Sequence, residues 1–147
     1  VLSRVELRSR SEIYYAIYPK EVNIEAGTMI KMASEQFIPA AIHYSTILAN
    51  NINAILQAIP DADVSVQKEL LSKTNGLLKE AAEALQALKD TVTEAKKLAH
   101  GERRARFYCS EVMPAMKKLR KPVDLLETIV DRELWPIPTY GELLYEL

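Results

Sequence analysis

The sequence is poor in several residue types, and each shortage excludes a class of structure. Cys109 is the single cysteine among the 147 residues, so the chain has neither an intrachain disulfide nor a thiolate cluster for zinc, which fits a reducing compartment. The four glycines are scattered singly and form no phosphate-binding loop. No apolar run is long enough to span a bilayer, and no signal-peptide pattern opens the chain. We therefore expect a cytoplasmic protein without a membrane partner.

An excess of charge of one sign is also lacking. Nineteen basic and twenty acidic side chains leave a formal net charge of −1. A protein with this balance has no global field that would attract nucleic acid, so we expect no nucleic-acid partner.

What the sequence does contain is helix-forming residues arranged in apolar stripes. Residues 3–19 form the first expected helix, which should end at Pro19 because proline cannot donate a backbone N–H. Residues 22–59 carry one apolar stripe with spacings of three and four. Pro39 falls inside this stripe, and the stripe resumes in phase, so we expect a kink between Gln36 and Pro39 and no helix end.

Residues 64–99 keep a 3.5-residue apolar period, which is typical of coiled coils, and Asp63 or Ser65 is expected to cap this helix. Gly76 within it marks either a weak point or a close helix crossing, and Gly101 should end the helix. Residues 105–130 repeat the rhythm, with Cys109 among the core positions. A straight helix over residues 64–99 would be roughly 50 Å long. We therefore predict an all-α fold, an elongated antiparallel helical bundle with long coiled-coil-like helices.

The chain finishes with ELWPIPTYGELLYEL, which predicts a strap. Pro136 and Pro138 stop the last helix and fix an extended segment. Trp135 is the expected anchor, and the leucines between Tyr140 and Leu147 can lie against the apolar end of the bundle. The predicted organisation is a linking helix (residues 1–20), a helical bundle (residues 21–135) and a C-terminal strap with a short helix (residues 136–147). The leucines expected to lie against the apolar end of the bundle are Leu143, Leu144 and Leu147.

Few residues are candidates for chemistry. His43 lacks the lysine and glycine that follow a phosphorylated histidine in the usual motif, so a residue at the core boundary is the simpler interpretation. His100 precedes a glycine and is expected to favour the helix C-terminus. Cys109 is expected to be a buried, inert thiol. Glu25 and Glu35 lie three turns apart and do not form a carboxylate pair. We assign no catalytic, cofactor-binding or metal-binding residue.

One basic stripe stands out in the last long helix. Arg103, Arg106, Lys117 and Lys121 share a narrow sector if residues 103–121 are continuously α-helical. The stripe is either a solvated face, partly neutralised by nearby acidic residues, or a surface for an acidic protein partner. The second interpretation would make the chain a free-standing helical adaptor.

Two stretches resemble a known family. EVNIEAGTMIKMASEQFIPAAIHYSTILANNI is similar to the segment that follows the catalytic barrel of type III glutamine synthetases. EVMPAMKKLRKPVDLLETIVDRELWPIPTYGELLYEL resembles the C-terminus of that family, and the opening SRVELRSRSEIYYAIYPKEV its linking helix. The motifs at residues 25–32 and 135–144 are the specific ones, whereas residues 61–100 are only generically helical.

The resemblance implies an ATP-dependent enzyme that joins ammonia to glutamate through a γ-glutamyl phosphate, uses Mg²⁺ or Mn²⁺, and forms a large homo-oligomeric ring. The family holds its metal, phosphate and glutamate contacts in N-terminal domains of which this chain shows no sign. For this chain the resemblance therefore implies a non-catalytic C-terminal helical domain that serves subunit packing or regulation. The expected partners are the remaining catalytic portion and other subunits of the enzyme.

Overall fold

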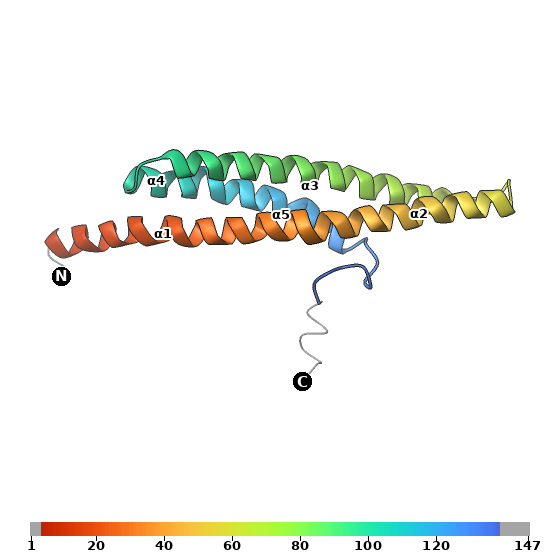
Figure 1. Ribbon diagram of the computed structural model, residues 1–147, viewed down its shortest axis with the longest axis horizontal. Helices are drawn as coiled ribbons and strands as arrows, with labels where there is room; N and C mark the ends of the chain where they lie inside the picture. Colours follow the sequence, from red (N-terminus) through yellow and green to blue (C-terminus); the bar gives the residue numbers. More distant parts are fainter. Residues whose placement is uncertain (1–3, 139–147) are drawn as a thin grey trace, which may run out of the picture.

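The computed structural model describes residues 4–138, which form three long rods of helix. In chain order the elements are α1 (Arg4–Met32), the π-helical turn η1 (Ala33–Phe37), α2 (Ile38–Ala58), α3 (Ser65–Lys97), α4 (Glu102–Phe107), the π-helical turn η2 (Tyr108–Val112) and α5 (Met113–Glu127). The first rod runs from α1 to α2, α3 returns beside it, and the third rod runs from α4 to α5 (Figure 1). The predicted all-α, elongated antiparallel bundle is confirmed.

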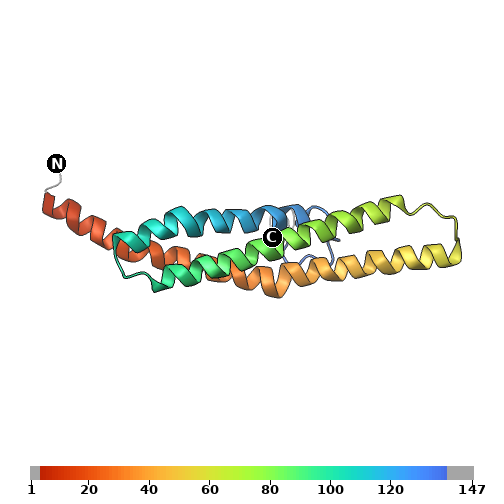
Figure 2. The ribbon, with the colours of Figure 1, turned by 90° about the horizontal axis from the view of Figure 1, so that it is seen from above.

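The core lies where α3 packs against the other two rods. Leu88 in the middle of α3 is completely buried, as are Leu119 and Leu126 of α5. Most residues at the positions of the apolar period predicted for α3 are buried. They include Thr74, whose hydroxyl donates a 2.7 Å hydrogen bond to the carbonyl of Leu70. The third rod ends at Glu127, so the bundle narrows to α2 and α3 alone towards the turn that joins them (Figure 2).

Pro19 does not end the first helix, so that prediction is wrong. α1 continues through Pro19 to Met32, and the proline is itself buried. A proline inside a helix removes one hydrogen bond and presses on the carbonyl four residues earlier. Here Val22 and Ala26, one and two turns later, are buried in the bundle. Their packing after the proline, together with that of Tyr18 before it, holds the helix and offsets the local cost.

The kink predicted before Pro39 is confirmed, and it takes the form of a π-helical turn. The N–H of Ile38 bonds to the carbonyl of Ala33, five residues earlier. The wider turn gives the proline ring room beside the preceding carbonyls. Figure 2 shows the long rod changing direction where α1 passes into α2. The same arrangement recurs before Pro114, where the N–H of Met113 bonds to the carbonyl of Tyr108.

Cys109 lies in the π-helical turn η2, and its position there differs from the core position that we expected. Cys109 is exposed, whereas its neighbour Tyr108 is completely buried and donates a 3.1 Å hydrogen bond from its hydroxyl to Oδ1 of Asn23. Positions 105, 108 and 112 satisfy spacings of three and four as well as 105, 109 and 112 do. The structure buries the first set, because the large Tyr108 ring fills the space beside α1. The prediction of a buried thiol is therefore wrong.

Two turns join the rods. At the first, the N–H of Ser65 donates a 2.9 Å hydrogen bond to Oδ1 of Asp63, and this bond lowers the pKa of the Asp63 carboxyl. The N-cap of α3 is Val64, without a side-chain cap hydrogen bond, so neither Asp63 nor Ser65 holds the capping position that we expected. At the second, α3 ends at Lys97, and Gly101 adopts φ 121°, a conformation that favours glycine.

The segment after α5 is anchored by Trp135, as predicted. The Trp135 side chain is 7% exposed and its ring stacks on Phe37 with centroids 5.1 Å apart. A guanidinium nitrogen of Arg132 donates a 2.9 Å hydrogen bond to the carbonyl of Ile137. The segment crosses the flank of the bundle at the junction of α1 and α2, where the third rod stops, and not the outer end that we expected (Figure 1). Residues 140–147, with their leucines, lie outside the described residues.

Gly76 is a weak point in α3 and not a close crossing. It is exposed, and a Cβ atom built on it meets nothing within 4 Å. Replacing Gly76 with alanine is expected to raise the free energy of unfolding by about 1 kcal/mol, because alanine loses less backbone entropy in a helix. Urea denaturation followed by circular dichroism measures this. Gly101→Ala is the control and should destabilise by about 1–3 kcal/mol, because its φ disfavours a side chain. Equal effects at the two positions would contradict this account.

Candidate functional site

The residues singled out in the sequence are not brought together. His43 is exposed on α2, whereas His100 follows α3 at the opposite half of the molecule (Figure 1). Glu25 and Glu35 are both exposed. Within residues 4–138 no group of three or more histidine, cysteine, aspartate or glutamate side chains is placed to hold a metal ion.

Cys109 faces the N-terminal half of α1. Partial burial raises the pKa of the Tyr18 hydroxyl, and a hydrogen bond with the Cys109 side chain acts in the same direction. Tyr18 in turn stacks on Tyr14, with ring centroids 5.3 Å apart. Cys109 thus contributes to the contact between the first and third rods.

The π-helical turn η2 lies within the basic stripe. A π-helical turn contains about one residue more than an α-helical turn, so the residues after it are rotated by about 100° relative to those before it. Arg103, Arg106, Lys117 and Lys121 therefore spread over a wider sector than the narrow one predicted. Arg106 also forms an ion pair with Glu102, with Nε 2.8 Å from Oε1, and this contact raises the pKa of Arg106.

Two lysines of α5 lie beside acidic residues of the neighbouring rod. Lys118 and Lys121 line a shallow hollow of about 310 Å³ together with Glu80 and Glu83 of α3. The solvated and partly neutralised face is therefore the better description of the basic stripe.

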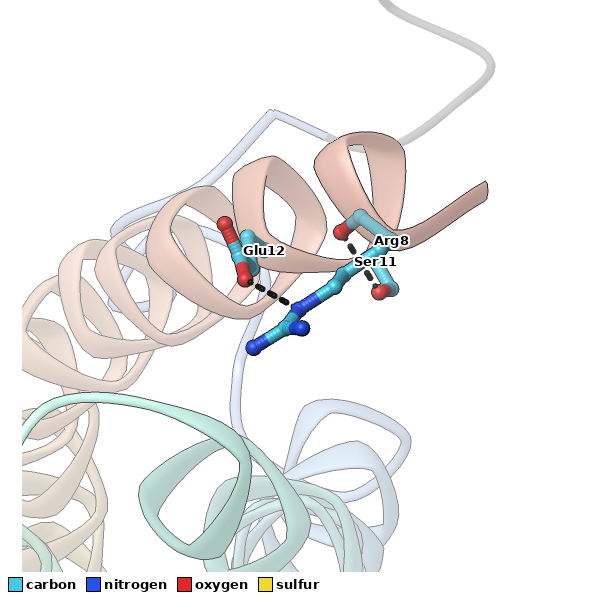
Figure 3. A network of polar contacts seen from close by, with 3 residues as sticks. All are labelled: Arg8, Ser11 and Glu12. Carbon is cyan, nitrogen blue, oxygen red and sulfur yellow. Dashed lines mark hydrogen bonds and ion pairs between the residues drawn. The ribbon is translucent and has the colours of Figure 1, made fainter. Parts of the chain in front are cut away.

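A hollow of about 640 Å³ lies between α1 and the turn that joins α3 to α4. Arg8, Glu12 and Tyr15 line it from α1, and His100 and Glu102 line it from the other side. Nε of Arg8 lies 3.2 Å from Oε1 of Glu12, one turn later on the same helix (Figure 3). The hydroxyl of Ser11 in the same network bonds to the carbonyl of Arg8. The acidic residues of this hollow are thus each paired with an arginine.

A second hollow, of about 310 Å³, adjoins the first and is lined by Lys20, Asn23, His100 and Arg104. Arg104 is half-buried, with its guanidinium carbon 5.9 Å from the centre of the Tyr108 ring and Nη1 3.3 Å from Nδ1 of His100. Arg104 Nε is buried without a hydrogen-bond partner among the described residues. His100 thus contacts α4, three residues beyond the end of the helix that we expected it to favour.

An apolar face of α1 is exposed beside these hollows. Ile13, Ile17 and Ile24 lie at spacings of four and seven, which places them on one side of the helix, and they are 55%, 48% and 68% exposed. Tyr14 next to them is 55% exposed. α1 projects beyond the turn between α3 and α4, so the N-terminal part of this face has no neighbour within the described chain (Figure 1). None of the helices described here is both long and apolar enough to cross a membrane.

Comparison with known proteins identifies the family. A model of the glutamine synthetase C-terminal domain matches residues 1–56. The type-3 glutamine synthetase of Dictyostelium discoideum is 34% identical over 99% of this chain and 20% of its own length. The glutamine synthetase of Bacteroides fragilis is 30% identical, over 99% of this chain and 20% of its own length. The chain therefore belongs to the type III glutamine synthetases, as a C-terminal domain. It spans about a fifth of the length of these relatives.

The match to the type III relatives covers nearly the whole chain, so it includes the residues that build the two hollows. Sequence reasoning missed these hollows because it ended the first helix at Pro19 and treated residues 1–20 as a separate linking helix. A signal was available in the spacing of Tyr15, Pro19 and Asn23, which recur every fourth residue and form one face of a helix that passes through the proline.

Proposed function

We propose that this chain is a non-catalytic helical domain of a larger glutamine synthetase and that it serves the packing of that enzyme. The observation that supports the packing role is the exposed apolar face of α1 with Ile13, Tyr14 and Ile17. Burying three half-exposed side chains of this size contributes about 1 kcal/mol each. Such a face is suited to a permanent contact with the rest of the enzyme.

The chemistry belongs to the remainder of the enzyme in this proposal. That portion would ligate ammonia to glutamate with ATP and with Mg²⁺ or Mn²⁺, as the resemblance implies. Among residues 4–138 the carboxylates of Glu12 and Glu102 are paired with arginines, and no metal-binding cluster occurs. The proposal places ATP and the metal ions outside this domain, and places the domain in a homo-oligomer.

The alternative of a free-standing adaptor for an acidic partner has less support. It depends on one narrow basic stripe, whereas η2 spreads the four basic residues over a wider sector and Arg106 is paired with Glu102.

Replacing Ile13 and Ile17 together with serine tests the packing role. In the full-length enzyme we expect a loss of the complete oligomer, measured by light scattering after size-exclusion chromatography, with a parallel loss of glutamine formation. The reason is that serine removes most of the apolar area that the contact would bury. The 147-residue chain with the same changes should keep its melting temperature, because both positions are about half exposed.

Ile42→Ser is the matched control, because Ile42 is 53% exposed on α2. It should leave assembly intact. An Ile13/Ile17 variant that assembles and works normally would refute the packing role. The 147-residue chain, assayed alone with ATP, Mg²⁺, glutamate and ammonia, should make no glutamine, and turnover by the purified chain would refute the non-catalytic assignment.

A further inference from the structure

The hollow lined by Lys20, Asn23 and Arg104 carries an inference that does not depend on the proposed function. Each of these residues offers hydrogen-bond donors, and two of them are cationic. An ammonium and a guanidinium have no acceptor atoms.

Most of the donors are free. Lys20 makes no ion pair among residues 4–138, and Arg104 Nε is buried without a partner. A buried N–H without a partner loses the hydrogen bond that it would make to water, and native structures rarely leave such a group unsatisfied. Arg104 Nη1 contacts Nδ1 of His100 at 3.3 Å. A guanidinium only donates hydrogen bonds, so the histidine nitrogen that faces it is the acceptor. That nitrogen therefore does not compete with the Arg104 N–H groups for a ligand that offers only acceptor atoms.

Asn23 is held in one orientation by the core. Its Oδ1 accepts the 3.1 Å hydrogen bond from the hydroxyl of Tyr108, whose ring is completely buried. With the oxygen occupied, the NH₂ group is the part of the Asn23 side chain that remains for a ligand. The Arg104 guanidinium is also positioned, since it lies against the same Tyr108 ring. Tyr108 thus supports two of the three donor residues.

Nearby carboxylates do not cancel this positive charge. Glu12 and Glu102, in the adjoining hollow, are paired with Arg8 and Arg106. Neither of them lines the hollow of Lys20 and Arg104. Its volume of about 310 Å³ is at the lower end of the range for small-molecule sites.

We infer that this hollow binds a compact oxyanion, a phosphoryl or carboxylate group, through Lys20, Asn23 and Arg104. An oxyanion is an acceptor-only ligand that matches a donor-only site, and charge-assisted hydrogen bonds are the strong ones. The Lys20 ammonium and the Arg104 guanidinium would both donate to the bound group. The site lies between α1 and α4, so a bound anion would join the first rod to the third.

Titration of the 147-residue chain with sodium phosphate, and separately with sodium acetate, tests the inference. Ionic strength is held constant with sodium chloride, and binding is followed by the NMR shifts of the Lys20, Asn23 and Arg104 side chains and backbone. We expect saturable shifts confined to this hollow. Tighter binding of phosphate would identify a phosphoryl site, and tighter binding of acetate a carboxylate site.

Lys20→Gln and Arg104→Gln should each weaken binding by about tenfold or more, because each removes a charge-assisted hydrogen bond. Lys20 is exposed, so its variant keeps the test valid even if Arg104→Gln disturbs the packing on Tyr108. Lys73→Gln removes the same charge at an exposed position of α3 outside the hollow and should leave binding unchanged. Binding of neither anion, or equal weakening by Lys73→Gln and Lys20→Gln, would overturn the inference.

Discussion

Replacing Leu88 with alanine is expected to lower the free energy of unfolding by about 2–5 kcal/mol. Leu88 is completely buried in α3, the helix that packs against both other rods. Truncation removes the transfer free energy of the side chain and also leaves a cavity. Long helices on every side limit how far the surroundings can close over that cavity, which favours the upper part of the range. Urea denaturation followed by circular dichroism at 222 nm measures the change.

Leu125→Ala is the matched control. It makes the same chemical change on α5 at a side chain that is 43% exposed, and we expect a loss of less than about 1.5 kcal/mol, since partial exposure reduces the transfer free energy that is lost. Similar losses at the two positions would mean that the bundle does not have the dry central core described here. If the slope of the unfolding free energy against urea concentration is unchanged in both variants, each substitution changes stability and not the compactness of the folded or unfolded state.

The fold was predictable where the apolar period was unbroken. In α3, Leu85, Leu88 and Val92 occupy the buried side that their spacing indicates. Such a stripe has one way to leave water, so it fixes which side of the helix is buried. Pro39 was also predictable, because the stripe continued beyond it in phase and a helix end would have left that continuation without a partner.

The errors arose where a local rule competed with tertiary packing. Pro19 is unfavourable in an isolated helix, but burial of Val22 and Ala26 after it holds α1 together. Cys109 and Tyr108 both fit the apolar period, and only the space beside Asn23 of α1 decides that the tyrosine is buried. That space is created by another rod, and the sequence near residue 108 carries no information about it.

The hollow of Lys20, Asn23 and Arg104 was beyond sequence reasoning for the same reason. Lys20 and Asn23 of α1 lie more than 80 positions before Arg104 of α4 in the chain. No short motif joins them, and their alignment depends on the hydrogen bond between Tyr108 and Asn23. The anchor Trp135, in contrast, was predictable, because a large ring directly before a segment held extended by two prolines needs burial. The prolines do not stop the last helix, however, since α5 already ends at Glu127.

Trp135→Ala is the second change expected to have a large effect, a loss of about 3–5 kcal/mol in the free energy of unfolding. The ring is 7% exposed, stacks on Phe37 of η1 and lines an apolar groove of about 470 Å³ with Met29 and Leu119. Its removal would expose the place where three rods become two. For a chain of this size the melting temperature should fall by about 10 °C. Trp135→Phe is the conservative control. It should retain more than half of the unfolding free energy that Trp135→Ala loses, because a smaller ring can still stack on Phe37.

Deletion of residues 136–147 separates the anchor from the segment that follows it. The truncated chain keeps Trp135 but loses Ile137, which packs against the core, and the carbonyl that accepts a hydrogen bond from Arg132. We expect a smaller fall in melting temperature than for Trp135→Ala, together with aggregation at micromolar concentration, because the apolar groove beside Phe37 is uncovered. Calorimetry and light scattering measure the two effects. A truncated chain that keeps its melting temperature and stays monodisperse would contradict this, since residues 136–147 would then add nothing to this bundle and their apolar side chains would be left for contacts with another subunit.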